Sequence, residues 1–301
     1  MAAKDERKKE GKRGKFGLSA CRHVVQVLVL LLFCVPVVAT GWSLFGQNGV
    51  FSELSDDAVL APSSLPFFGT LSSSSIGPVT LLDPFAVLQT IFAAKTISPD
   101  WIIGLLPVLI VYGLIRGRVF CGWVCPVNLV LEAVDWLRRR VRPGQKLAER
   151  VVPRHAKIDV AAAVLVLSAL VSVPVFEVLS PVSFLNKGLV LGSTVGGVTL
   201  AAIVVAELFW GHRVWCRSLC PLGGFYQLLG KVGLVSVSAE PDTCIGCNKC
   251  KEACLCDPQI LDAVVEGSAS VVRAGDCMLC GKCVDVCPAK CLSVGVRFKD
   301  S

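Results

Sequence analysis

Eight cysteines near the C-terminus constrain the fold more than any other feature of this sequence. They form two runs, CIGCNKCKEAC and CMLCGKCVDVC, each with the spacing C-x2-C-x2-C-x3-C. The second run repeats the first at a constant offset of 33 residues. A duplicated run of this spacing is typical of a bacterial ferredoxin domain that binds two [4Fe–4S] clusters.

The spacing also predicts which cysteine binds which cluster. Three thiolates on one short loop can bind three corners of a cubane, so the fourth corner must be reached from another segment. In two-cluster ferredoxins the fourth cysteine of each run binds the other cluster. We therefore expect cluster 1 on Cys244, Cys247, Cys250 and Cys287, and cluster 2 on Cys277, Cys280, Cys283 and Cys254.

Other uses of these cysteines fit the pattern less well. A structural zinc site takes two separated C-x2-C pairs, and a disulfide framework is typical of small secreted domains. Cys256 and Cys291 have no counterpart at the repeat offset, and we interpret both as spare thiols. The alternative is that Cys256 replaces Cys254 as a ligand.

The remainder of the chain is unusually apolar. Of all 301 residues, 53% are hydrophobic and only 18% are charged, whereas soluble domains carry about 25% charged residues. A helix of about 20 apolar residues crosses the roughly 30 Å hydrocarbon core of a membrane. We therefore expect four transmembrane helices, at residues 24–46, 101–115, 160–176 and 189–206. The second stretch is short, so we expect Arg116 and Arg118 to extend toward the membrane interface.

The basic residues predict the orientation. Residues 1–22, 116–157, 211–235 and 236–301 hold 28 of the 30 Lys and Arg residues. Because cytoplasmic loops carry the excess of basic residues, both termini are expected in the cytoplasm, with the chain in a bacterial inner membrane. The net charge of +7 follows this topology, so we expect no nucleic-acid partner.

These observations divide the chain into three parts. Residues 1–23 are expected to form a basic cytoplasmic tail, residues 24–235 an α-helical transmembrane domain, and residues 236–301 a cytoplasmic α+β ferredoxin domain. A cleaved signal peptide is the alternative for the first apolar stretch, but its 23 uncharged residues exceed the usual apolar region of about 7–15 residues. The segment 47–100 is expected to be a loop with a short helix at 85–94.

The apolar part contains a second, weaker repeat. The motif C-x3-C-P occurs in FCGWVCP at 120–126 and in WCRSLCP at 215–221, each time after an apolar stretch that a proline-containing loop precedes. The two halves have the same orientation, which predicts a parallel internal repeat about an axis along the membrane normal.

The cysteines of this motif are candidate redox or metal thiols. Pro126 and Pro221 suit the first position of a helix, so we expect the preceding cysteines at helix N-termini, where the helix dipole favours thiolates. If the two halves pair, four sulfurs converge on one metal or small cluster, from Cys121, Cys125, Cys216 and Cys220. The alternative is that they are small apolar residues at the starts of interfacial helices.

Two further features bear on a membrane role. Apolar residues recur at helical spacing over 127–141, beside three consecutive arginines, which predicts an amphipathic helix on the inner leaflet or packed on the cytoplasmic side. Ionisable groups at membrane depth are often functional, so five polar residues are candidates for handling quinol protons, with ordinary interface residues as the alternative: Asp83, Gln89, Glu177, Glu207 and His212.

The ordered motifs GRVFCGWVCPVNLV, VPRHAK, SPVSFLNKGLVLG and WCRSLCPLGGFYQLLG, followed by the double cysteine run, resemble the NapH/MauN family of ferredoxin-type membrane proteins. The likeness covers nearly the whole chain after about residue 20, and it departs from the family pattern at Leu255-Cys256, where a proline is usual. The resemblance implies four membrane helices and two cytoplasmic [4Fe–4S] clusters. It also implies that electrons pass from quinol of the membrane quinone pool, with a periplasmic ferredoxin subunit and a cytochrome, to a periplasmic nitrate reductase.

We therefore expect an electron-transfer subunit of a quinol dehydrogenase complex rather than a stand-alone enzyme, and we identify no catalytic residue. The runner-up is a maturation factor that uses its thiols and clusters to reduce or load metal in a partner enzyme. A purely structural anchor would leave eight cysteines without a role.

Overall fold

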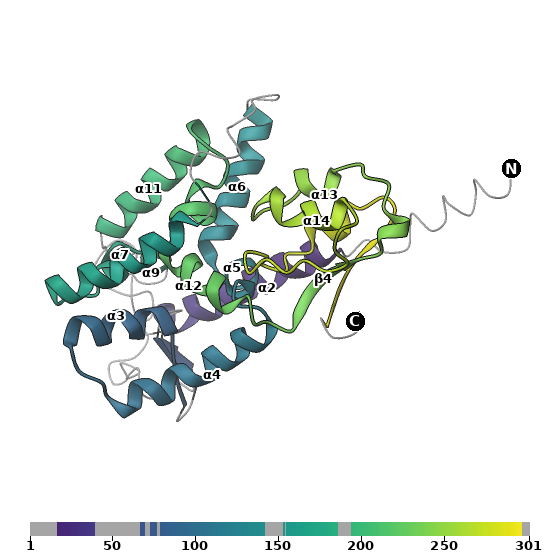
Figure 1. Cartoon of the computed structure of the whole chain (residues 1–301). Helices are drawn as coiled ribbons and strands as arrows, with labels where there is room; N and C mark the ends of the chain where they lie inside the picture. The colour runs from purple at the N-terminus through teal and green to yellow at the C-terminus, as the bar shows by residue number, and fades with distance from the viewer. Residues whose placement is uncertain are drawn as a thin grey trace, which may run out of the picture.

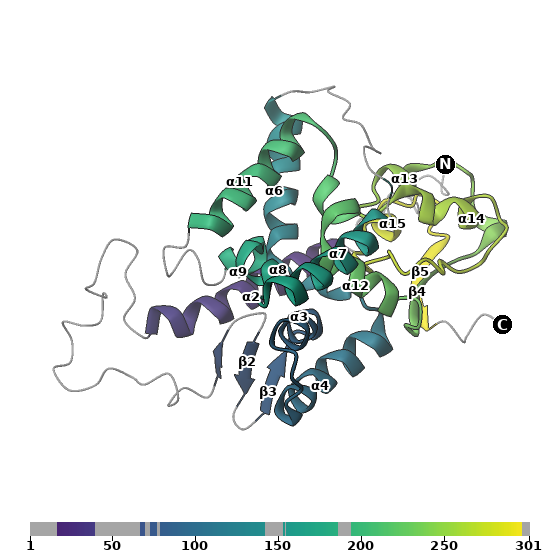
Figure 2. The same cartoon turned by 60° about the vertical axis from the view of Figure 1, so that its left-hand side comes forward.

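The computed structural model describes residues 17–39, 67–69, 73–76, 79–141, 153, 155–185 and 194–296. Within these ranges the chain is mostly helical and forms two parts. Figures 1 and 2 show a small C-terminal part, which contains β4, β5 and α13–α15, beside a larger helical part.

The helical part precedes residue 235. Its elements are α2 (Leu18–Ala39), α3 (Pro84–Ala94), α4 (Pro99–Ile115), α5 (Val119–Trp123), α6 (Pro126–Val141), α7 (Ala156–Val171), α8 (Val175–Leu179), α9 (Pro181–Ser183), α11 (Thr194–Phe209), the π-helical η3 (Trp215–Leu219) and α12 (Pro221–Leu229). The short helix expected at 85–94 is present as α3. The expectation of a loop before it was incomplete, because β1 (Phe67–Gly69), β2 (Ser73–Ile76) and β3 (Val79–Leu82) form an antiparallel sheet.

The helix starts follow their capping residues. Asp83 precedes Pro84, and its carboxylate accepts a hydrogen bond from the Ala86 N–H at 3.3 Å, so α3 begins with both signals of a helix N-terminus. Cys220 caps α12 in the same way, because its sulfur accepts from the Gly223 N–H at 3.4 Å. Pro126 and Pro221 stand first in α6 and α12, as expected.

The helix lengths differ from the expected membrane spans. Among the described residues, no helix is both long enough and apolar enough to cross a membrane. Helices α4, α7 and α11 have 17, 16 and 16 residues, which at 1.5 Å per residue is about 24–26 Å. The stretch 160–176 is divided between α7 and α8, because Ser172 has a left-handed backbone and Pro174 follows it. The expectation of four spanning helices is therefore not confirmed.

The C-terminal part is a small α+β domain. Strand β4 (Val235–Ala239) pairs antiparallel with β5 (Leu292–Val296), so that Val235 lies opposite Val296. Between the strands lie η4 (Pro241–Thr243), α13 (Lys249–Glu252), η5 (Pro258–Leu261), α14 (Asp262–Val265) and α15 (Lys282–Asp285). Asn248 before α13 and Gly281 before α15 both have positive φ and stand 33 residues apart. The sequence duplication is therefore also a duplication of the backbone.

Buried arginines join the two parts. Arg116 is fully buried and donates to the carbonyls of Val235, Val272 and Ala274. Arg118 donates to the Asp276 carbonyl at 3.0 Å and to its carboxylate at 3.2 Å. The expectation that these arginines extend toward a membrane interface was wrong, because buried carbonyls and a carboxylate of the C-terminal domain bind them.

A second group of ion pairs links α2 to α6 and to the C-terminal domain. Arg22 belongs to α2 and is fully buried, although it was expected in the basic tail. Its guanidinium pairs with the Glu132 carboxylate of α6. His23 and Lys282 also contact this carboxylate, at 2.9 and 3.0 Å. The neighbouring cations, Arg22 foremost, lower the pKa of Glu132 despite its burial. Residues 1–16 of the expected tail lie outside the described part.

Candidate iron–sulfur sites

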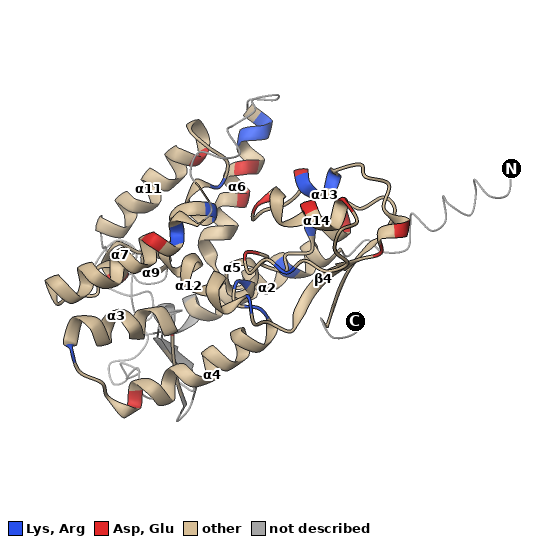
Figure 3. Ribbon diagram, viewed as in Figure 1, with Lys and Arg blue, Asp and Glu red and all other residues tan. Residues whose placement is uncertain are grey.

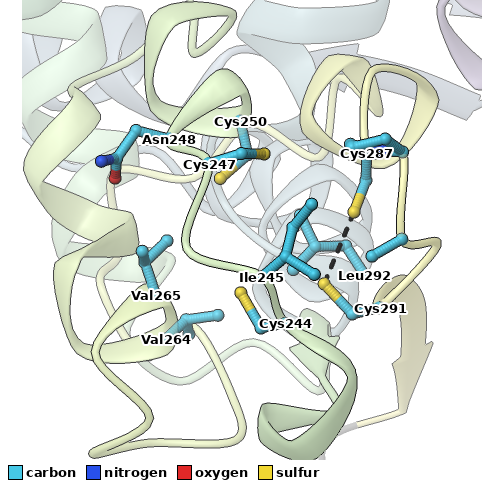
Figure 4. Close-up of a pocket in the computed structure, with 12 residues that line it drawn as sticks. Cys244, Ile245, Cys247, Asn248, Cys250, Val264, Val265, Cys287, Cys291 and Leu292 are labelled. Atoms are coloured by element: carbon cyan, nitrogen blue, oxygen red, sulfur yellow. Dashed lines mark hydrogen bonds between the residues drawn. The ribbon is translucent and has the colours of Figure 1, made fainter.

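The cysteines of the duplicated run line two separate cavities. The first has an empty volume of about 370 Å³ and is lined by Cys244, Cys247, Cys250, Cys287 and Cys291. Figure 4 shows Cys287 and Cys291 facing the loop of the first run across this cavity, with 3.4 Å between their sulfurs. The fourth cysteine of the second run therefore lies with the first three of the other run, as cross-ligation requires.

The second cavity repeats this arrangement. It has an empty volume of about 350 Å³ and is lined by Cys277, Cys280, Cys283, Cys254 and Cys256. A hydrogen bond from the Cys254 thiol, helped by nearby Arg118, lowers the pKa of Cys256 to about 6 although Cys256 is buried. Both Cys254 and Cys256 line the cavity, so the structure is compatible with Cys254 as the fourth ligand and also with the alternative, Cys256.

The sulfur spacing fits clusters better than single ions. In a mononuclear zinc site with Zn–S bonds near 2.3 Å, tetrahedral sulfurs lie about 3.8 Å apart. Among the described residues, only Asp135, Glu207 and His212 bring three metal-ligand atoms within 4.8 Å of one another. The cysteines thus share cavities, but no three of their sulfurs come as close together as the ligands of one ion do, which fits the wider spacing that an iron–sulfur cluster needs.

A third cavity lies between the two C-x3-C-P motifs. Its empty volume is about 420 Å³, and all four cysteines of the motifs line it, namely Cys121, Cys125, Cys216 and Cys220. The two motifs therefore lie at the walls of one cavity. Its walls are otherwise largely apolar, with Phe120, Val127, Val182, Trp215, Leu222 and Met278, and Arg118 is the cation among them.

We expected these cysteines to favour the thiolate form, but without a bound metal they favour the neutral thiol. Burial raises the pKa of Cys216 to about 11 and that of Cys220 to about 12. Burial likewise raises the pKa of Cys121 and Cys125. The helix N-terminus does contact Cys220, but in this apolar cavity desolvation outweighs that contact. The unliganded thiols are therefore neutral at neutral pH, and a bound metal centre is what would hold them as thiolates.

The five polar candidates for proton handling separate into two groups. Tyr226 donates to the Asp83 carboxylate at 3.0 Å, and burial raises the pKa of Asp83 to about 7. Gln89 accepts from the Phe176 N–H, and Glu177 accepts from the Ser183 hydroxyl. The other group, Glu207 and His212, lies near α6, where His212 is 3.1 Å from Asp135.

The predicted amphipathic helix is α6, and it has two halves. Val127 and Leu131 are buried in the helical core, whereas Leu137 and Val141 are exposed beside the arginines. The helix is therefore packed at its start and presents its apolar face outward at its end.

Asp276 is the residue that sequence reasoning missed most clearly. It immediately precedes Cys277, and its buried carboxylate accepts hydrogen bonds from Arg118, Lys157 and Gln227. These donors come from positions 49 to 158 residues away in sequence. No local spacing could have indicated them.

Two cavities lined by a duplicated cysteine run, on a small α+β domain with one two-stranded sheet, define a ferredoxin-type iron–sulfur protein. Comparisons with known sequences agree. The family described as "4Fe-4S dicluster domain" matches residues 236–288, and the family described as "4Fe-4S binding domain" matches twice, at residues 97–143 and 193–237.

Curated relatives identify the family. The chain is 33% identical to the ferredoxin-type protein NapH of Escherichia coli over 76% of this chain and 80% of the relative. It is also 33% identical to the methylamine utilization ferredoxin-type protein MauN of Methylorubrum extorquens, over 75% of this chain and 78% of the relative. This chain belongs to the NapH/MauN family of ferredoxin-type proteins, and its role is iron–sulfur electron transfer. No solved structure matches it.

Proposed function

We propose that this chain is a membrane-bound electron-transfer subunit that takes electrons from quinol and passes them toward a periplasmic reductase of the nitrate reductase type. The electrons pass through two [4Fe–4S] clusters, on Cys244, Cys247, Cys250 and Cys287, and on Cys277, Cys280, Cys283 and Cys254. The observation that carries the proposal is the buried joint at Asp276, which fixes the second cysteine run against the apolar helical part.

The outer surface of the helices supports a membrane location. Helix α2 exposes Val24, Val27, Leu28, Leu31 and Leu32, and α4 exposes Ile102, Ile103, Leu106, Ile110, Val111 and Leu114. Figure 3 shows that α4 and α11 carry charged residues only near their ends. Soluble proteins rarely expose large contiguous apolar patches. Membrane lipid is therefore the partner proposed for these faces, in a bacterial inner membrane with both termini in the cytoplasm.

A buried acid beside the third cavity supports quinol as the donor. Quinol gives up two electrons and two protons, whereas each cluster accepts one electron at a time. Asp83 accepts a hydrogen bond from Tyr226, and the Tyr226 ring stacks on Phe120 at 5.4 Å. Phe120 in turn lines the cavity of the four C-x3-C-P cysteines. Asp83, a proton acceptor with a pKa of about 7, is thus connected to the cysteine-lined cavity through the stacked rings of Tyr226 and Phe120.

The proposed partners follow from the family. Resemblance to NapH supports a periplasmic ferredoxin subunit and a cytochrome as the next carriers, with the quinone pool as the source. The buried joint adds that the helical part and the cluster domain act as one unit.

The test is reduction of the clusters by a hydroquinone. The full chain is purified anaerobically in detergent, and a water-soluble hydroquinone such as duroquinol is added while cluster absorbance and EPR spectra are recorded. We expect single-electron reduction of the clusters, and we expect an Asp83→Asn variant to be slowed while dithionite still reduces it fully. Full reduction by dithionite together with none by the hydroquinone would refute quinol as the donor.

Membrane attachment has its own test. We expect the tagged full chain to stay in the membrane fraction after alkaline carbonate washing and to need detergent for release. Recovery in the supernatant of that wash would refute insertion of the apolar helices, whatever the electron donor.

A further inference from the structure

The two C-x3-C-P motifs together form one site that neither motif can form alone. Each segment matched by the "4Fe-4S binding domain" family contains only two cysteines, Cys121 and Cys125 in 97–143, and Cys216 and Cys220 in 193–237. A [4Fe–4S] cluster is usually held by four thiolates. The structure brings the two pairs to the walls of a single cavity.

We infer that Cys121, Cys125, Cys216 and Cys220 bind a third [4Fe–4S] cluster, shared between the two halves of the helical part, which passes electrons to the cluster of the second cysteine run. This inference rests on the proposed function for the identity of the electron donor. The cluster itself does not depend on that donor.

The size of the cavity supports a cluster. Its empty volume of about 420 Å³ is close to the 370 and 350 Å³ of the two ferredoxin cavities. No three of its four sulfurs lie within 4.8 Å of one another, and the same is true of the eight ferredoxin cysteines among the described residues. In volume and in sulfur spacing the third cavity is like the two cluster cavities, and its sulfur spacing is unlike that of a site for one metal ion.

The charge of the surroundings supports a bound anion. Four thiolates and a [4Fe–4S] core together carry net negative charge, and burial of that charge requires cations nearby. Arg118 is almost completely buried, lines the cavity and hydrogen-bonds the Cys121 side chain. It also donates to the Cys216 carbonyl at 2.7 Å. Arg118 also pairs with the Asp276 carboxylate, but Lys157 shares that single negative charge, so positive charge remains beside the cavity.

The position of the cavity defines a route for electrons. Met278 of the second run is buried and lines both this cavity and the cavity of Cys277, Cys280 and Cys283. A Cβ atom added at Gly122, next to Cys121, would lie 2.6 Å from the Met278 carbonyl oxygen, so the first C-x3-C-P segment is in direct contact with the second cysteine run. In each step the third cluster is oxidised by one electron and the adjacent cluster is reduced by one. Hydroquinone, the proposed donor, gives two electrons to the third cluster, one at a time. It is oxidised to quinone and releases two protons.

The test is the iron content of the full chain, purified anaerobically in detergent. Three cubanes give about twelve iron atoms per chain. We expect the variant Cys121→Ser/Cys125→Ser to hold about eight, with the EPR signals of the two ferredoxin clusters retained as evidence of folding. Cys21→Ser is the matched control, because Cys21 is exposed on α2, and it should keep all twelve.

Variants of the other half test whether the site is shared. We expect Cys216→Ser/Cys220→Ser to lose the same four irons, and the quadruple variant to lose no more. Unchanged iron in either double variant would overturn the inference, as would additive losses, which mean separate sites, or one zinc per chain in place of iron. Iron content is measured without any quinol. A negative hydroquinone test would therefore refute the proposed electron donor without affecting the evidence for the third cluster.

Discussion

Asp276 offers the sharpest test of how the cluster domain is held. Its carboxylate is 3% exposed and pairs with Arg118 and Lys157, whose side chains are 2% and 1% exposed. Gln227 donates to the other carboxylate oxygen at 2.8 Å. Removal of one partner from a buried ion pair costs about 3–5 kcal/mol, because the remaining charge has no counter-ion.

Arg118 and Lys157 share this carboxylate, but the free-energy costs of leaving each of them without a counter-ion do not simply add. Burial, with Arg118 close by, lowers the pKa of Lys157, and Asp276 opposes that effect. In Asp276→Asn, Lys157 gives up its proton more readily, while Arg118 stays charged. We therefore expect a loss of about 3–5 kcal/mol near neutral pH. A base with a lowered folded-state pKa costs less stability as the pH rises, so the loss should shrink toward alkaline pH.

The assay is thermal loss of cluster absorbance in the detergent-solubilised full chain. The expected energy corresponds to a fall of about 6–20 °C in the midpoint. Asp242→Asn is the matched control, because Asp242 also lies close to a cluster cysteine but is exposed. The reasoning is refuted if the melting midpoint of Asp276→Asn equals that of the wild type, or if it falls no further than that of Asp242→Asn. The ion pairs of Asp276 would then not hold the cluster domain in place.

Three further outcomes are expected. Cys254→Ser should lose about four irons while Cys256→Ser keeps them, as measured by iron analysis, and the reverse result would make Cys256 the ligand. Gly122→Ala should lower the melting midpoint, because its Cβ would lie 2.6 Å from the Met278 carbonyl, and an unchanged midpoint would contradict the tight contact. Asp83 has a raised pKa of about 7, so wild-type stability should fall as pH rises from about 4 to 7; Asp83→Asn should flatten this dependence in pH-dependent melting, and the exposed Asp100→Asn should not.

The positions of the cysteine loops were largely predictable, because they depend on local geometry. A constant offset of 33 residues predicted the duplicated loops, and the backbone repeats at the same offset, as Asn248 and Gly281 show. The C-x3-C-P prolines predicted the starts of α6 and α12. In each case short-range geometry, a tight loop or a helix N-terminus, leaves a fixed spacing in the sequence.

The electrostatics were poorly predicted, because they depend on long-range burial. Arg22 was expected in a solvated tail and Arg118 at a membrane interface, yet both are buried in ion pairs. Cys220 was expected to favour the thiolate form, yet burial raises its pKa to about 12. Whether a charge is paired or desolvated depends on what packs against it, and the partners here lie about a hundred residues or more away, as with Arg22 and Glu132.

The sequence by itself determined that this chain carries a duplicated iron–sulfur loop fused to an apolar helical part, because ligand spacing and hydrophobicity are properties of nearby residues. Only the tertiary structure decided that the four C-x3-C-P cysteines line one cavity, and that Met278 separates this cavity from that of the second run. It also decided that Asp276 receives its donors from three distant segments. Such contacts arise when helices pack, and packing brings together residues whose order in the chain does not indicate that they meet.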